Sequence, residues 1–376
     1  MASQKIISSD SHIVEPPGLW TQRMVGKYSD RAPSLVKGKA DDFYVDGKPV
    51  GATLGGLTAA GLRFEKPEDI KLEGKITGVM PGAYEPSPRL KDMDQDGIYS
   101  DLIYPSVGLH MFSAVEDSDL VRSIFAAYND WLADFCSANP DRLKGIAMIL
   151  IDDDINGGIR ELQRVAKKGL GGAMISVFPR PGESYDQPRY EPFWAAAEET
   201  GLPISLHVGT NRPGSLPTPG GKDTKITPSG ATRANNEHWV RMTLCHIIFS
   251  GVCERYPNLM FIQLEHELAW LPFFMGRLDY VYRERKQLTP YRFKAGAVPT
   301  DFMRRNIYHS FQEDGLGVRD RDIIGVDNLC WGSDYPHAES TFPRSKEILE
   351  EILADVPDDE RVKITASNAA RLYRIQ

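Results

Sequence analysis

Short apolar runs rich in β-branched residues recur along the chain, and from residue 98 onward amphipathic stretches with helical period separate them. This alternation is typical of parallel strands joined by crossover helices. The runs that we interpret as strands are 5–10, 99–104, 143–149, 172–177, 203–208, 259–265, 306–311 and 328–334. The stretches that we interpret as helices are 118–138, 155–168, 190–200, 236–255, 268–286 and 342–354.

Eight strands with helices between them favour a closed (β/α)8 barrel, the TIM-like architecture of the α/β class, with a doubly wound open sheet as the alternative. Residues 16–97 break the alternation with clustered Gly and Pro, so we expect an insertion after the first strand, including a hairpin at Asp46-Gly47. The Gly- and Pro-rich stretch 209–234 follows the fifth strand and is interpreted as a lid. Residues 1–376 are expected to form one barrel domain.

Charge and composition predict a small-molecule partner. The 376 residues include 44 Lys and Arg against 52 Asp and Glu, a formal net charge of −8 with no basic stretch, so neither nucleic acid nor an anionic membrane is expected. The start, MASQKIISSDSH, lacks the apolar segment of a signal peptide, and no window of 18 apolar residues follows, which predicts a cytoplasmic protein. The four cysteines form no C-x-x-C pair and receive no role.

Polar residues stand at the ends of four predicted strands, where catalytic groups of such barrels lie. Asp10 and His12 end the first strand, two positions apart and therefore on one face, while His207, His266 and Asp334 end or follow the fifth, sixth and eighth strands. Imidazoles and carboxylates together suit Zn²⁺, the favoured ion, with Mn²⁺ and Fe²⁺ as alternatives. A single Asp-x-His pair is more often a cap or a surface group, but the recurrence at several strand ends predicts one metal site.

Four further residues are candidates for binding a substrate. His110 follows the second strand and His337 lies just beyond Asp334, so both could reach the mouth of the barrel. Arg180 and Arg212 follow the fourth and fifth strands, and a guanidinium can hold both oxygens of a carboxylate. For each arginine a solvated surface charge is the competing interpretation. The chain has no G-x-S-x-G, Walker loop, G-x-G-x-x-G or H-E-x-x-H, so a metal is expected to carry the reaction.

The segments SSDSHIVEPPGLW, SLHVG, FSGVCERYPNLMFIQLEHELAWLP, NLCWGSDYPH and ASNAARLY, in this order, resemble the amidohydrolase-related family, the branch that includes aminocarboxymuconate semialdehyde decarboxylase. The resemblance implies a metal-dependent TIM-like barrel in which Asp10, His12, His207 and Asp334 bind one divalent ion. It also implies that His266 is a catalytic histidine outside the ligand set. A homodimer is expected from the family alone.

One departure from the family pattern and one missing residue bear on the expected chemistry. Decarboxylases of this branch commonly have His-x-His or Glu-x-His where this chain has Asp10-Ser11-His12. Binuclear members need a carboxylated lysine after the fourth strand, and GAMISVFPRP has none, so one ion is expected.

Three functions are compatible with these residues. The first is nonoxidative decarboxylation, or related carbon-carbon cleavage, of an aromatic or dienoic acid, with His266 or Asp334 delivering a proton. The alternative is hydrolysis of an ester, lactone, amide or carbon-carbon bond by a metal-activated water, with Asp334 as the base. A binding protein without activity is the third, and nothing in the ligand set favours it.

Overall fold

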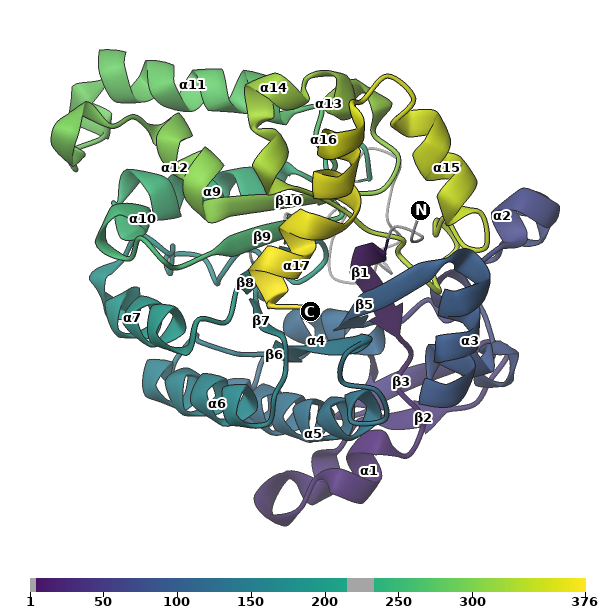
Figure 1. Ribbon diagram of the computed structural model, residues 1–376. Helices are drawn as coiled ribbons and strands as arrows, with labels where there is room; N and C mark the ends of the chain where they lie inside the picture. Colours follow the sequence, from purple (N-terminus) through teal and green to yellow (C-terminus); the bar gives the residue numbers. More distant parts are fainter. Residues whose placement is uncertain (1–4, 215–232) are drawn as a thin grey trace.

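The computed structural model describes residues 5–214 and 233–376, and within them eight strands form one parallel sheet that follows chain order. Each strand lies where the sequence predicts one, with helices around the outside (Figure 1). The strands of this sheet are β1 (Ile6–Ile13), β5 (Ile98–Pro105), β6 (Leu143–Met148), β7 (Gly172–Ile175), β8 (Ile204–His207), β9 (Phe261–Leu264), β10 (Ile307–Phe311) and β11 (Leu329–Trp331).

The first and last strands of the sheet meet and close the barrel. The backbone N–H of Asp334 donates to the carbonyl oxygen of Asp10 at 2.9 Å, and the hydroxyl of Ser9 donates to the carbonyl oxygen of Trp331 at 2.9 Å. Gly332 allows this close approach, because a Cβ there would lie 2.6 Å from the Cβ of Asp10. The predicted (β/α)8 barrel is therefore confirmed, and the doubly wound sheet is wrong.

Amphipathic helices cover the barrel, and acidic side chains cap the starts of two of the long ones, α5 and α6. The side chain of Asp117 accepts hydrogen bonds from the first turn of α5, and Asp154 does the same for α6. The helices are α1 (Leu19–Arg23), α2 (Leu62–Glu65), α3 (Pro86–Asp96), α4 (Val107–Ala114), α5 (Ser118–Cys136), α6 (Ile155–Lys167), α7 (Glu191–Thr200), α9 (His238–Phe249), α10 (Val252–Arg255), α11 (Leu271–Glu284), α12 (Pro299–Asn306), α13 (Gly315–Arg319), α14 (Arg321–Ile324), α15 (Ser345–Ile352), α16 (Asp358–Val362) and α17 (Asn368–Tyr373).

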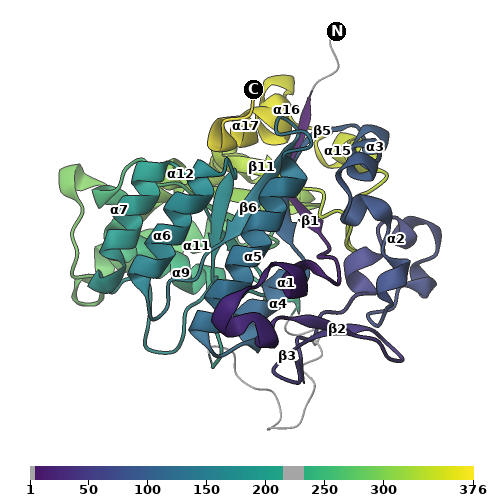
Figure 2. The same cartoon turned by 90° about the horizontal axis from the view of Figure 1, so that it is seen from below.

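The insertion between β1 and β5 holds a small antiparallel sheet of β2 (Ser34–Val36), β3 (Asp42–Val45) and β4 (Lys48–Pro49). The predicted hairpin joins β3 and β4, and its two turn residues, Asp46 and Gly47, have φ of 52° and 74°. Figure 2 shows this sheet toward the end of the barrel where α4 lies, opposite the C terminus. Residues 215–232 of the predicted lid lie outside the described residues.

The C-terminal helix α17 covers the end of the barrel where the strands begin. The hydroxyl of Tyr373 lies 3.1 Å from the hydroxyl of Tyr104 on β5, which in turn lies 2.8 Å from the hydroxyl of Ser205 on β8. The side-chain amide of Asn368 donates to the carbonyl oxygens of Val326 and Leu329. Side chains therefore fill the centre of this end of the barrel, and the C-terminal ends of the strands lie at the opposite rim.

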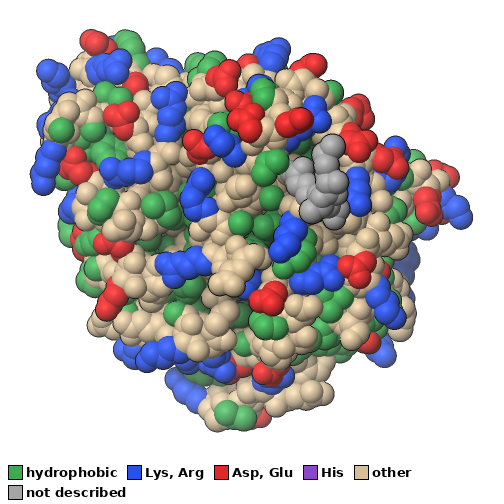
Figure 3. All heavy atoms as spheres, viewed as in Figure 1, with side chains coloured by type: hydrophobic (Ala, Val, Ile, Leu, Met, Phe, Trp, Pro, Cys, Tyr) green, Lys and Arg blue, Asp and Glu red, His purple; other side chains and the backbone are tan. Residues whose placement is uncertain are grey.

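The surface seen in Figure 3 mixes Lys and Arg with Asp and Glu, without a large area of one sign. Among residues 5–214 and 233–376, no helix combines the length and the apolar character that crossing a bilayer requires.

Candidate metal centre

Five side chains converge where the strands end. Asp10 and His12 come from the last part of β1, His207 ends β8, Glu265 directly follows β9, and Asp334 follows β11. The Nε2 atom of His12 lies 3.3 Å from Nε2 of His207, 3.5 Å from Oδ1 of Asp10 and 3.4 Å from Oδ1 of Asp334. Donor atoms about 2.0–2.2 Å from one ion lie at similar distances from each other. The structure thus brings together all four ligands that the family resemblance implies.

Both imidazoles are held so that Nε2 faces the other donors. Nδ1 of His12 lies 2.9 Å from the carbonyl oxygen of Pro105, and Nδ1 of His207 lies 2.9 Å from the carbonyl oxygen of Val208. A carbonyl oxygen only accepts, so each Nδ1 carries the hydrogen and each Nε2 presents a lone pair. This is the tautomer that a metal ligand needs.

Glu265 is part of this cluster, although the sequence did not identify it. Its Oε1 lies 3.2 Å from Nε2 of His12 and 3.5 Å from Nε2 of His207. Its φ is 59°, in the left-handed region that non-glycine residues avoid, and the same holds for Asp334 at 56°. The sequence signal for Glu265 is a carboxylate at the end of the sixth predicted strand, directly before His266.

The carboxylates of this cluster have buried oxygens that lack a hydrogen-bond partner within the described part of the chain: Oδ1 of Asp10, Oε1 of Glu265 and Oδ1 of Asp334. Burial and the neighbouring Glu265 raise the pKa of Asp334. Burial alone would lower the pKa of His12, but the carboxylates of Asp10 and Glu265 outweigh it and raise the pKa. Unpaired buried anions are costly unless a cation neutralises them, so the cluster fits a divalent metal ion.

His266 lies next to this cluster but is held in a different way. Its Nδ1 lies 2.9 Å from Oε1 of Gln263, and the indole N–H of Trp270 donates to its carbonyl oxygen at 2.7 Å. Its Nε2 is buried without a hydrogen-bond partner among the described residues. Burial and the neighbouring His207 lower the pKa of His266 to about 3, so the ring is neutral. His266 is not among the side chains whose donor atoms cluster for a metal.

His337 joins the cluster from the segment after β11. Its Nδ1 lies 2.7 Å from Oδ1 of Asp334, its Nε2 lies 3.0 Å from the hydroxyl of Ser106, and its ring stacks on that of His12 at 4.0 Å. His110, the other predicted substrate-binding histidine, lies on α4, and burial lowers its pKa to about 4. Contact of either histidine with a substrate stays a prediction.

The two predicted substrate arginines lie around one buried carboxylate. Nε of Arg180 lies 3.5 Å from Oδ2 of Asp152, and Nε of Arg212 donates to the same oxygen. Arg212 also donates to the carbonyl oxygens of Phe112 and Val115. Two guanidinium groups thus share one carboxylate beyond the end of β6. Their role in holding a substrate carboxylate stays a prediction.

A fully buried arginine on α3 holds the motif at the end of β1. Arg89 donates to the carbonyl oxygen of His12 and to the hydroxyl of Ser11, both at 2.7 Å, and its Nε donates to Asp101 at 2.8 Å. Its guanidinium also lies 4.4 Å from the ring centroid of Tyr335, the residue after Asp334. Arg89 therefore contacts both chain segments that carry the carboxylates of Asp10 and Asp334.

Known proteins resemble this chain over most of its length. A family model described as Amidohydrolase matches residues 80–375. The chain belongs to the amidohydrolase family. Gamma-resorcylate decarboxylase of Rhizobium radiobacter is 28% identical over 302 residues, which cover 76% of this chain and 86% of that protein. The 2-amino-3-carboxymuconate-6-semialdehyde decarboxylase of Dictyostelium discoideum is 24% identical over 267 residues, which cover 67% of each protein.

Solved structures confirm the fold of this amidohydrolase family member. An amidohydrolase from Mycobacterium avium subsp. paratuberculosis aligns with a TM-score of 0.78 and 21% identity, covering 99% of this chain and 100% of that one. A 2,6-dihydroxybenzoate decarboxylase from Rhizobium aligns with a TM-score of 0.66 and 22% identity, covering 99% of each. A dihydroxybenzoic acid decarboxylase from Polaromonas with bound manganese aligns with a TM-score of 0.63 and 19% identity, covering 99% of this chain and 97% of that one.

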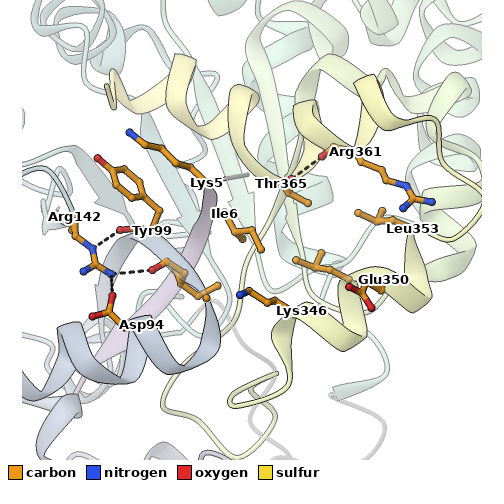
Figure 4. A pocket seen from close by; sticks show the side chains of 13 residues that line it. Lys5, Ile6, Asp94, Tyr99, Arg142, Lys346, Glu350, Leu353, Arg361 and Thr365 are labelled. Atoms are coloured by element: carbon orange, nitrogen blue, oxygen red, sulfur yellow. Dashed lines mark hydrogen bonds and ion pairs between the residues drawn. The ribbon is translucent and has the colours of Figure 1, made fainter. Parts of the chain in front are cut away.

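A cavity of about 610 Å³ lies at the opposite end of the barrel from the candidate metal centre. Figure 4 shows its lining from the starts of β1 and β5 and from α15, including Ile6, Tyr99, Lys346 and Leu353. Its neighbour Arg142 is already bound to Asp94 at 2.7 Å. Active sites of TIM barrels lie at the other end, so this cavity is separate from the chemistry.

Proposed function

We propose that this protein is a divalent-metal-dependent decarboxylase that removes carbon dioxide from an aromatic carboxylic acid without oxidation. The observation that carries the proposal is the convergence of Asp10, His207 and Asp334 on Nε2 of His12, with unpartnered buried carboxylate oxygens among the described residues, beside a neutral His266. The relatives named as decarboxylases of gamma-resorcylate and of 2-amino-3-carboxymuconate-6-semialdehyde support it.

Asp10, His12, His207 and Asp334 would hold the ion, of which zinc is the sequence-based choice. When bound, a divalent ion supplies a Lewis acid for the oxygens of the substrate carboxylate or of a neighbouring hydroxyl. The protein contributes fixed donors, since the carbonyl oxygens of Pro105 and Val208 orient both imidazoles. These two hydrogen bonds would keep the rings of His12 and His207 directed at the ion.

The reaction breaks the bond between the ring carbon and the carboxylate carbon, the electron pair stays on the ring carbon, and a proton replaces carbon dioxide there. Asp334 and His337, whose Oδ1 and Nδ1 atoms are 2.7 Å apart, hold that proton beside the cluster. His266 has its Nδ1 hydrogen bonded to Gln263, so its bare Nε2 accepts a hydrogen bond, as from a hydroxyl group of the ring. Asp334 delivers the proton in this proposal, and His266 orients the substrate.

The decisive experiment measures the release of carbon dioxide and the incorporation of deuterium into the product. Metal-loaded protein is incubated in D₂O with 2,6-dihydroxybenzoate or 5-carboxyvanillate, acids of the kind that similar proteins are named for. One carbon dioxide released per turnover, with one deuterium on the carbon that lost it, is the expected result. Hydrolysis of an ester, lactone or amide with no carbon dioxide released would support the alternative and contradict the proposal.

Replacing His266 with Asn should separate catalysis from metal binding. The variant loses the bare imidazole Nε2 but removes none of the clustered metal donors. We expect turnover to fall by about 100-fold, because the substrate loses a group that orients it, while the bound metal per chain stays as in the wild type. Metal analysis and initial rates check this. Loss of the metal from the variant would place His266 among the ligands instead.

The cellular location and the oligomeric state rest on the sequence and on the family alone. A cytoplasmic protein and a homodimer remain predictions, which fractionation and light scattering can test.

A further inference from the structure

We infer that Glu265 is a fifth ligand of the metal and that it shifts the preference of the centre away from Zn²⁺ toward Mn²⁺. The inference rests on the metal dependence within the proposed function, but it does not depend on which reaction the metal serves.

The carboxylate of Glu265 lies among the candidate metal donors. Oε1 of Glu265 lies 3.2 Å from Nε2 of His12 and 3.5 Å from Nε2 of His207, which are the separations found between the other donors of the cluster. It has no hydrogen-bond partner among residues 5–214 and 233–376, although its atom is buried. When both rings carry their hydrogen on Nδ1 only, as metal ligands do, a carboxylate oxygen aimed at their two Nε2 lone pairs makes no favourable contact with them. A cation between these atoms makes the arrangement favourable.

The backbone of Glu265 is strained. Glu265 has φ of 59°, a conformation that costs a non-glycine residue on the order of 1 kcal/mol and that glycine adopts freely. Glycine would remove this strain. A glutamate in a strained backbone conformation beside other donor atoms indicates function rather than stability.

Coordination chemistry decides the metal preference. Without Glu265, two imidazoles and two carboxylates form a four-donor set of the kind that tetrahedral Zn²⁺ occupies. Glu265 adds one more carboxylate oxygen, which lies close both to the donors of Asp10, His12 and His207 and to those of His12, Asp334 and His337. Oxygen-rich sites with more than four ligands suit Mn²⁺, whereas Zn²⁺ keeps its higher absolute affinity in most sites. The effect of Glu265 therefore lies in the ratio of the two affinities.

The test compares Glu265→Gly with the matched control Glu267→Gly. Glu267 lies two residues away with nearly the same φ of 56°, but its carboxylate accepts from the backbone N–H of Gln312 and is not part of the cluster. Metal-free proteins are titrated with Mn²⁺ and with Zn²⁺, and the melting temperature of each metal-free protein is recorded. Glu265→Gln, which keeps the shape but weakens the ligand, is titrated in the same way.

We expect Glu265→Gly to lower the Mn²⁺ affinity by about 10- to 100-fold and the Zn²⁺ affinity by several-fold less, with a metal-free melting temperature at or above that of the wild type. Glu265→Gln should shift the ratio in the same direction, and Glu267→Gly should leave it unchanged. An unchanged Mn²⁺ affinity, or an equal fall for both ions, overturns the inference. If the affinity ratio shifts but no carbon dioxide is released, the proposed function fails and this inference survives.

Discussion

Replacement of His12 with Ala is expected to abolish metal binding and to lower turnover by on the order of a thousandfold or more. His12 is fully buried, and its Nε2 lies within 3.5 Å of donor atoms of Asp10, His207 and Asp334. Its removal takes the central donor out of the cluster, so the remaining carboxylates and His207 no longer surround an ion. Metal content per chain and initial rates on the same preparations measure the effect.

The control for His12→Ala is His238→Ala. His238 is exposed at the start of α9 and contributes no donor to the cluster, so its replacement should leave metal content and turnover unchanged. Chelation of the wild-type metal should reproduce the loss seen with His12→Ala, and readdition should restore activity only in the wild type. A His12→Ala protein that keeps a full complement of metal would contradict the assignment of His12 as a ligand.

The barrel and most of its metal donors could be predicted because both follow from strand order. Apolar runs mark the strands, and parallel strands place all their C-terminal ends at one rim. Asp10, His12 and His207 stand on the last part of such strands, and Asp334 follows the last strand closely, so strand order alone was enough to predict that they lie near one another. The hairpin could be predicted for a different reason: Asp46 and Gly47 are residue types that adopt the positive φ of a tight turn.

Glu265 was missed because its direction depends on a backbone turn that alternation along a strand does not describe. A positive φ directly after β9 turns this side chain toward the cluster, and the neighbouring His266 then takes a separate place against Gln263. The contacts of His337 with Asp334 and of Arg212 with Asp152 depend on the loops beyond the strands. Hydrophobic pattern carries little information about such loops.

Helices lie on the periodic stretches, but several others were not predicted, among them α4 and α12. The α4 sequence is mostly apolar and buried, so it has no polar face to give a helical period. Glu15 accepts hydrogen bonds from the first backbone N–H groups of this helix, those of Val107 and Gly108, both at 2.8 Å. That contact comes from a distant part of the chain and is invisible to a local pattern.

Replacement of Arg89 with Met is expected to lower the free energy of unfolding by about 3–5 kcal/mol. The guanidinium and the carboxylate of Asp101 are 2.8 Å apart and both are buried, so the variant leaves a buried carboxylate without its cation. It also removes the donors to the carbonyl oxygen of His12 and to Ser11. Denaturant unfolding of the metal-free proteins measures the change.

The matched control is Arg319→Met, because the side chain of Arg319 is 70% exposed and, within the described part of the chain, forms an ion pair with the adjacent Asp320 at 3.2 Å. Its free energy of unfolding should change by less than about 0.5 kcal/mol. A loss of stability for Arg89→Met no larger than that of Arg319→Met would contradict the structural role of Arg89.

The pH dependence of Arg89→Met identifies the unpaired carboxylate as the cause. Burial raises the pKa of Asp101 even beside Arg89, and removing the guanidinium should raise it further. The folded variant then binds a proton that the unfolded chain has released, so its stability falls as pH rises above the unfolded pKa of about 3.9. The deficit relative to the wild type should therefore be smaller at acidic than at neutral pH, and Arg89→Met with Asp101→Asn should lose less stability than the single variants together. A deficit independent of pH would assign the loss to packing against Tyr335 instead.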